Sequence, residues 1–123
     1  MVHLDTNFLI QALVAGSAPE AKLVGWIAAG EQLGISTIAW SEFLCGPLAT
    51  HDEALALSFL TAPEAFLVQD AFKAAELFNL TGRRSRSLAD CQIAAVALRV
   101  GARLATTNVA DVAPFQAHGL ILA

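Results

Sequence analysis

The beginning of the chain decides the fold, and it reads VHLDTNFLIQAL over residues 2–13. Val2–Leu4 is a short apolar run, which predicts a buried strand. Phe8–Leu13 predicts a helix that follows at once, with Asp5, Thr6 and Asn7 at the junction. A strand that passes directly into a helix indicates an α/β chain, provided that the same order continues along the sequence.

Further helices and strands are expected in alternation. Capping boxes at residues 17–20 and 50–53 predict helices over 18–30 and from about 51 to 60. A helix that carries Glu42 is expected to end at Gly46-Pro47, Asp70 can cap a helix over 71–80, and a helix that starts at Ser87 is expected to end at Gly101. The remaining expectations are strands over Gly34–Ala39, Phe66–Val68, Arg103–Thr106 and Gly119–Leu122, with an irregular or helical link over Asn108–Phe115.

The predicted strands are continuous apolar runs, not alternating ones. Such strands are buried on both faces, as in a parallel sheet with helices on either side. The chain has 123 residues, which suits one domain. The expected fold is therefore a single three-layer α/β/α domain over residues 1–123, with a central parallel sheet.

Composition excludes several classes of protein. Hydrophobic residues make up 56% of the chain and charged residues 15%, which argues against disorder. The longest uncharged stretch, Thr6–Pro19, is shorter than the roughly 20 apolar residues of a bilayer span, and no basic signal-peptide region opens the sequence. Cys45 and Cys91 lack a metal-binding or disulfide spacing. A soluble cytoplasmic protein is expected, and its apolar surplus suggests a covered surface, such as that of a homodimer.

Acidic residues fall where a parallel sheet binds its ligands, beyond the carboxyl ends of the strands. The acidic quartet comprises Asp5, Glu42, Asp90 and Asp111. Each member has an ordinary structural alternative as a helix cap, a turn residue or a solvated carboxylate. Together, however, they would repel one another, and a hard divalent ion such as Mg²⁺ or Mn²⁺ relieves that repulsion. Such a site can polarise a phosphodiester and activate a water molecule.

The other polar groups add little independent evidence. The three histidines are expected to be structural, and no His–Cys set favours zinc. Arg83, Arg84 and Arg86 form a basic run just before Asp90; an isolated run of this kind is usually a solvated loop, but beside a metal site it could bind phosphates. The net charge of −4 therefore does not exclude a nucleic-acid partner.

Four segments of the chain resemble the signature segments of PIN domains: Val2–Asn7, Trp40–Glu42, Leu88–Ala95 and Leu104–Asp111. In length and layout the chain is most similar to the VapC-type toxins of bacterial and archaeal toxin–antitoxin pairs. The resemblance implies a metal-dependent endoribonuclease in which the acidic quartet holds Mg²⁺ or Mn²⁺, with Asp5 and Asp90 as the central ligands. It also makes Thr6, Asn7 and Asn108 polar neighbours of the site that contact substrate, a ligand water or a carboxylate.

The resemblance also implies a cognate antitoxin, and the expected groove lies between the helices over 18–30 and 42–60. Thr107 and Val112 depart from the pattern, in which arginine and phenylalanine are frequent at these places. Two alternatives stay open. One is a PIN-like scaffold that binds RNA or protein without cutting it, and the other is a metal-dependent phosphatase, which the second residue after Asp5, Asn7, disfavours.

Overall fold

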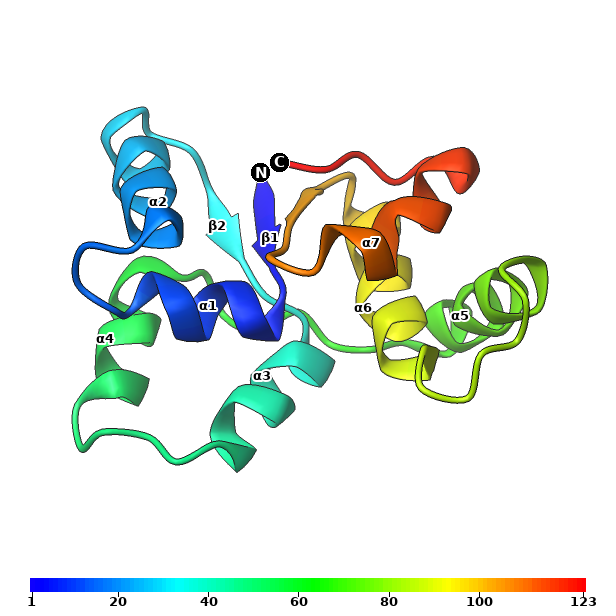
Figure 1. The fold of residues 1–123 in the computed structure, drawn as a ribbon, viewed down its shortest axis with the longest axis horizontal. Coiled ribbons are helices and arrows are strands. Elements are labelled where there is room, and N and C mark those ends of the chain that lie inside the picture. The colour runs from blue at the N-terminus through cyan, green and yellow to red at the C-terminus, as the bar shows by residue number, and fades with distance from the viewer.

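A three-stranded parallel sheet forms the centre of the computed structural model, which describes all 123 residues. The strands are β1 (Val2–Leu4), β2 (Leu33–Gly34) and β3 (Arg103–Ala105), in the order β2-β1-β3. β1 pairs in parallel with both neighbours, with Val2 opposite Leu33 and Arg103. The carboxyl ends of the three strands therefore lie at the same end of the sheet. Because β1 is the middle strand (Figure 1), the residue that follows it, Asp5, stands at the centre of the carboxyl end of the sheet.

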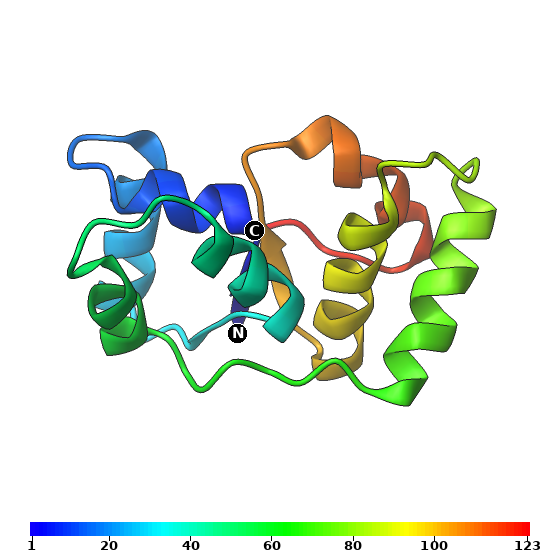
Figure 2. The ribbon, with the colours of Figure 1, turned by 90° about the horizontal axis from the view of Figure 1, so that it is seen from below.

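Helices surround this small sheet and confirm the predicted α/β class (Figures 1 and 2). Both views show α1, α2 and α4 gathered on one side of the strands and α5 and α6 on the other. No helix is long and apolar enough to cross a membrane. The helices are α1 (Thr6–Ala12), α2 (Ala18–Ala28), α3 (Thr37–Cys45), α4 (Asp52–Phe59), α5 (Val68–Leu80), α6 (Leu88–Val100), α7 (Val109–Val112) and the 3-10 helix η1 (Ala113–His118).

The strand predicted over Gly34–Ala39 is wrong from Thr37 onward; β2 itself ends at Gly34, and an isolated parallel bridge joins Ser36 to Glu64. The Ser36 hydroxyl oxygen accepts a hydrogen bond from the Ala39 N–H at 3.1 Å, so helix α3 begins at Thr37. An N-cap of this kind outweighs the strand preference of the β-branched residues around it. Glu42 consequently lies in the second turn of α3, later in its helix than expected.

Two other predicted strands are absent as strands. The segment Phe66–Val68 leads into α5, which begins at Val68 because the Asp70 carboxylate accepts a hydrogen bond from the Leu67 N–H at 2.8 Å. Near the carboxyl end, only an isolated bridge between Leu104 and Leu122 joins the last residues to the sheet. Leu67 and Val68 are exposed, and in the last segment Leu120 is buried whereas Ile121 is exposed. A short apolar run therefore does not by itself identify a buried strand.

The start of α4 also differs from the predicted capping box. His51 occupies the N-cap position without a side-chain hydrogen bond, and the Asp52 carboxylate accepts from the Ala49 N–H at 3.0 Å. By contrast, the Ser17 box is formed in part, because the Ser17 hydroxyl oxygen accepts from the Glu20 N–H at 3.1 Å.

One hydrophobic cluster of 23 buried residues lies between the sheet and the helices. Phe43 and Phe115 are its largest fully buried side chains, and Phe8 packs on Trp26 with ring centroids 5.6 Å apart. His3 is also buried, as expected for a strand residue, and its ring lies against Gly34. A Cβ on Gly34 would come within 2.8 Å of that ring, so the close approach of β1 and β2 requires glycine there.

An arginine on α6 fixes the long connection between α4 and α5. Arg99 donates from Nε to the Asp70 carboxylate at 2.9 Å and from Nη1 to Glu64 at 3.1 Å. Its Nη2 donates to the Ala65 carbonyl at 2.9 Å. Because the Asp70 side chain is only 2% exposed, the ion pair is largely shielded from solvent, and it ties the start of α5 and the connection before it to α6.

Candidate active site

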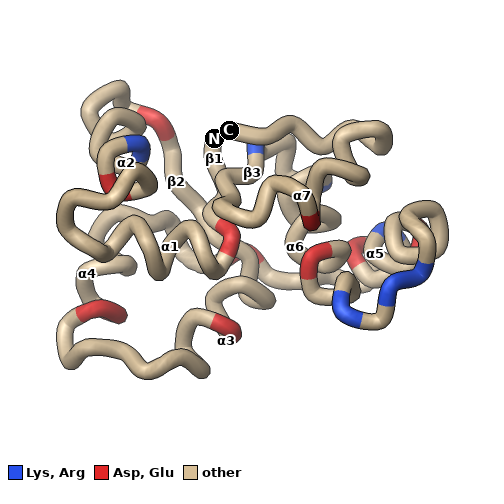
Figure 3. The backbone as a smooth tube through the Cα atoms, viewed as in Figure 1, with Lys and Arg blue, Asp and Glu red and all other residues tan.

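The fold brings the acidic quartet to one face of the molecule. Asp5 follows β1, Glu42 stands in α3, Asp90 in the first turn of α6, and Asp111 in α7, which follows β3. In Figure 3 the acidic segments of these elements surround the space between α1, α3, α6 and α7. The sequence-predicted acids are therefore neighbours, although up to 106 residues separate them along the chain.

Asp5 is the buried member of the quartet, with only 5% of its surface exposed. One carboxylate oxygen accepts a hydrogen bond from the Thr6 N–H at 2.8 Å, and the other accepts from the Thr106 hydroxyl at 2.9 Å. Burial raises the pKa of Asp5, the two hydrogen bonds oppose that rise, and the charge of Asp111 adds to it. The hydrogen bonds hold the carboxylate in one orientation at the centre of the site.

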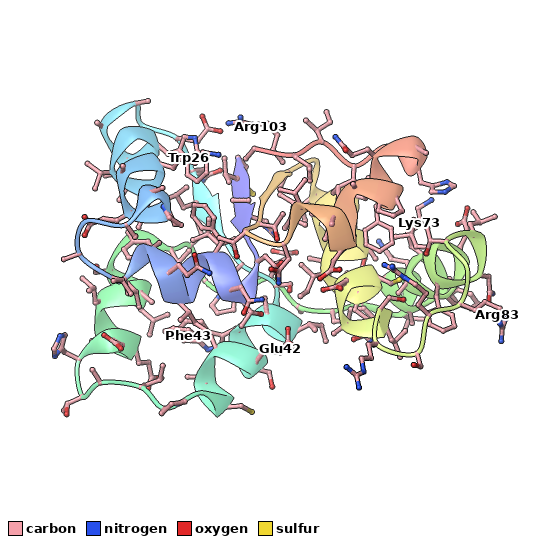
Figure 4. All side chains as sticks on the ribbon, viewed as in Figure 1. Trp26, Glu42, Phe43, Lys73, Arg83 and Arg103 are labelled. Carbon is pink, nitrogen blue, oxygen red and sulfur yellow. The ribbon has the colours of Figure 1, made fainter.

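Glu42 is exposed but is also held by a threonine. The Thr6 hydroxyl donates to a Glu42 carboxylate oxygen at 2.9 Å and lies 3.4 Å from the Ala39 carbonyl oxygen. Thr6 is itself buried, so α1 fixes where the end of the Glu42 side chain lies. Figure 4 shows Glu42 on the side of α3 that faces α1.

Asp90 differs from both because no side chain or backbone group donates a hydrogen bond to it. Burial is the largest cause of a rise in the pKa of Asp90 to about 6, and the charges of Asp5, Asp111 and Glu42 add to it. Arg84 acts in the opposite direction. Without a counter-ion, this carboxyl group is protonated in mildly acidic solution.

The donor chemistry of the quartet fits a hard divalent cation. All four side chains offer carboxylate oxygens, and their mutual repulsion is the feature that a cation would relieve. However, no three Asp, Glu, His or Cys side chains are arranged so that together they could hold a metal ion. An ion bound here would keep several waters and take one or two carboxylates directly, as Mg²⁺ commonly does.

A polar pocket of about 370 Å³ adjoins the quartet. None of its lining residues is hydrophobic, and they are Arg84, Ser85, Arg86, Ser87, Asp90 and Asp111. Cationic and hydroxyl side chains beside carboxylates can bind a phosphate group while the acids hold a cation.

The third predicted arginine, Arg83, points away from this pocket. It has the left-handed backbone angle φ 54°. Its guanidinium donates to Asn79 at 2.6 Å and lies over the Phe78 ring at 5.8 Å. Figure 4 shows Arg83 directed outward at the far end of α5. Only Arg84 and Arg86 of the basic run therefore line the site.

The side chains of the two predicted asparagines are exposed and make no hydrogen bond within the protein. Asn7 is exposed in the first turn of α1, and Asn108 is exposed at the start of α7. Sequence reasoning missed Thr106, which binds Asp5 directly. Its position directly after β3 matches that of Asp5 after β1, and that shared place at the sheet edge was the available signal.

Comparisons with known proteins agree with this geometry. The PIN domain profile matches residues 2–111. No curated protein sequence matches the chain.

Three solved structures share the fold. VapBC2 from Rickettsia felis, bound to a DNA fragment from its promoter, aligns over 100% of this chain and 98% of its own, with 22% identity and a TM-score of 0.75. A toxin–antitoxin complex from Klebsiella pneumoniae covers 92% of this chain and 91% of its own, with 27% identity and a TM-score of 0.73. VapC20 from Mycobacterium tuberculosis, a toxin that cleaves the sarcin–ricin loop, covers 100% and 98%, with 21% identity and a TM-score of 0.66. Because the family profile covers most of the chain and spans all four acids, the protein belongs to the PIN domain family.

Proposed function

We propose that the protein is a metal-dependent endoribonuclease and the toxin of a toxin–antitoxin pair. The observation that carries the proposal is the convergence of four carboxylates, one of them with a pKa raised to about 6, beside an all-polar pocket lined by two arginines. Membership of the PIN family and the likeness to toxin–antitoxin structures support it. The proposed reaction is hydrolysis of an RNA phosphodiester by activated water.

A bound Mg²⁺ or Mn²⁺ ion would supply a Lewis acid and a water of lowered pKa. Asp5 and Asp90 are the proposed central ligands, with Glu42 and Asp111 completing the site. The hydrogen bonds from Thr6 and Thr106 keep both oxygens of Asp5 as acceptors, so this side chain is held ready as a carboxylate. Asp90 has no such donor, and a cation bound near it would lower its pKa and so favour its ionised form.

Arg84 and Arg86 are proposed to bind RNA phosphates on the α6 side of the quartet. They line the pocket that Asp90 and Asp111 also line. Asn7 and Asn108, with free side chains at the rim, are proposed to contact the same substrate. We expect Arg84→Ala to raise KM about tenfold, the scale of a lost hydrogen bond to a charged group. Arg83→Ala is the matched control and should leave KM unchanged, because Arg83 contacts Asn79 instead.

The antitoxin is proposed to bind the side of the molecule formed by α1, α3 and the loop before α4. A small groove of about 150 Å³ lies there, mostly lined by apolar residues: Ile10, Leu13, Phe43, Gly46, Pro47, Leu48 and Asp52. Ile10, which lines the groove, is 42% exposed to solvent, and Leu44 of α3 is 43% exposed. The groove lies between α1, α3 and the segment before α4, whereas the sequence alone predicts an antitoxin groove formed by the helices over 18–30 and 42–60. We also propose a homodimer in the cytoplasm.

Cleavage of a structured RNA pool by the purified protein tests the proposal. Cutting should require Mg²⁺ or Mn²⁺, stop in EDTA and be lost in Asp90→Asn. This variant is a sharper control than Asp5→Asn, because Asp5 accepts two hydrogen bonds that an amide would disturb whereas Asp90 accepts none. RNA binding that ignores EDTA, without cutting, would instead favour a non-catalytic scaffold. Hydrolysis of phosphate monoesters alone would favour a phosphatase.

A further inference from the structure

A single hydroxyl group joins the central carboxylate to the turn that leads to α7. Thr106 Oγ1 lies 2.9 Å from Asp5 Oδ2 and accepts a hydrogen bond from the Asn108 backbone N–H at 3.0 Å. Thr106 is half-buried and directly follows β3, next to the end of β1. The hydroxyl therefore lies between the Asp5 carboxylate and the turn that leads to α7, the helix that carries Asp111.

The chemistry of the groups fixes the direction of these hydrogen bonds. A backbone N–H can only donate, so Thr106 must accept from Asn108. A hydroxyl has one proton, and that proton is directed at Asp5 Oδ2. Because the Thr6 N–H donates to Asp5 Oδ1 at 2.8 Å, each oxygen of the carboxylate has one fixed donor. Asp5 is thus held at both oxygens and cannot rotate without losing a hydrogen bond.

This restraint opposes the forces in the site. Asp5 is buried beside the negative charges of Asp90 and Asp111, so an unrestrained carboxylate would turn away from them. Glu42 has a comparable hydroxyl partner in Thr6, whereas Asp90 and Asp111 have none. The two hydroxyl-bound acids come from the elements on one side of the site, and the two free acids come from α6 and α7.

We infer that Thr106 is a positioning residue that acts through Asp5. It sets the orientation of the Asp5 carboxylate and the distance between that carboxylate and the turn before α7. The predicted effect on metal affinity rests on the proposed function, whereas the hydrogen bonds that position Asp5 do not depend on it. Hydrogen-bond partners of metal-binding side chains typically change metal affinity 10- to 100-fold when removed. Loss of the Thr106 hydroxyl should therefore weaken Mn²⁺ binding by about that factor and lower kcat, with the KM for RNA little changed.

The test uses Thr106→Val, which keeps the shape of the side chain, and Thr106→Ser, which keeps the hydroxyl. Thr107→Val is the matched control, because the neighbouring Thr107 hydroxyl accepts only a 3.4 Å contact from Gln11. Crystal structures of the metal-free variants report the orientation of Asp5, and calorimetry with Mn²⁺ alone reports affinity. Thermal unfolding checks that each variant is folded, and Thr106→Ala replaces the valine variant if that one is not.

The inference predicts that Asp5 turns and that Mn²⁺ affinity falls about 10- to 100-fold in Thr106→Val. Thr106→Ser and Thr107→Val should match the wild-type protein in both measurements. An unchanged Asp5 orientation in Thr106→Val, or a serine variant as impaired as the valine one, would overturn the inference. If the wild-type protein binds no Mn²⁺, the proposed function fails, and the crystallographic orientation of Asp5 still decides whether Thr106 positions it.

Discussion

The charge of Asp90 should lower the free energy of unfolding of the metal-free protein, compared with a variant that has an uncharged side chain at this position. Its carboxyl group is half-buried, receives no hydrogen bond and stands near three other acids, and its pKa is raised to about 6. At neutral pH the folded protein must keep this group ionised at a cost. Asparagine at the same place has a similar shape and no charge. We therefore expect Asp90→Asn to raise the free energy of unfolding in EDTA while it removes a proposed metal ligand.

The size of the effect follows from the pKa. A rise from 3.8 to about 6 is about two units, or about 3 kcal/mol at 1.36 kcal/mol per unit. Solvent screening of a half-exposed group reduces this figure, and loss of a charge in the first turn of α6 removes about 0.5 kcal/mol of favourable helix-dipole energy. A gain of about 1–2 kcal/mol is expected at pH 7.5.

The pH dependence of this gain has a definite sign. Because the folded-state pKa lies above the unfolded value, the wild-type protein recovers stability as the pH falls through 6 toward 3.8. The advantage of Asp90→Asn should therefore shrink to about a third at pH 4.5.

Urea unfolding in EDTA at the two pH values measures the effect. Glu53→Gln is the control, since Glu53 is an exposed acid in the first turn of α4. Its stability should change by less than about 0.5 kcal/mol. The reasoning is refuted if Asp90→Asn is no more stable than the wild-type protein at pH 7.5, or if its advantage does not shrink in acid.

Three further predictions concern the scaffold, each measured by urea unfolding. Arg99→Leu should lower the unfolding free energy by about 3–5 kcal/mol, because Asp70 would stay buried without its cation; a loss below 1 kcal/mol would contradict this. Gly34→Ala should cost about 1–3 kcal/mol, because the new Cβ meets the His3 ring, and the same substitution should cost much less when it is made in a His3→Ala variant. Ser36→Ala should cost about 1 kcal/mol by removing the cap of α3, whereas Ser36→Thr, which keeps the hydroxyl group, should cost less.

The helices were largely predictable because their ends carry local signals. Ser17 caps α2 through the Glu20 N–H, and Gly101 ends α6 with the left-handed φ of 70° that glycine tolerates. The strands were harder to predict. Strands of two or three residues have no periodicity, so apolar runs such as Phe66–Val68 look the same whether they pair in a sheet or lead into a helix.

The acids of the site and their neighbour Thr6 were predictable, but the role of Thr106 and the direction of Arg83 were not. Each acid follows a predicted strand or begins a helix, and the order of elements brings such residues to one edge. Arg83 contacts Asn79 whereas Arg84 lines the pocket, and Arg83 has the left-handed backbone angle φ 54° in the loop before α6. The role of Thr106 depends on the parallel pairing of β1 with β3, which places it beside Asp5. The angle of Arg83 leaves no trace in residue spacing, and the only sequence signal for Thr106 is its place at the end of the strand predicted over Arg103–Thr106.

The chemistry of the RNA ends tests the central claim most directly. A structured RNA is cleaved with Mg²⁺ in water enriched in heavy oxygen, and the new ends are analysed by mass spectrometry. Attack by a metal-activated water predicts linear phosphate ends that carry one solvent oxygen from the cleavage step itself, with no cyclic intermediate at the earliest times. These products should be absent in EDTA and with Asp90→Asn. Cleavage that persists in either control, or that first yields cyclic 2′,3′-phosphates, would contradict the account.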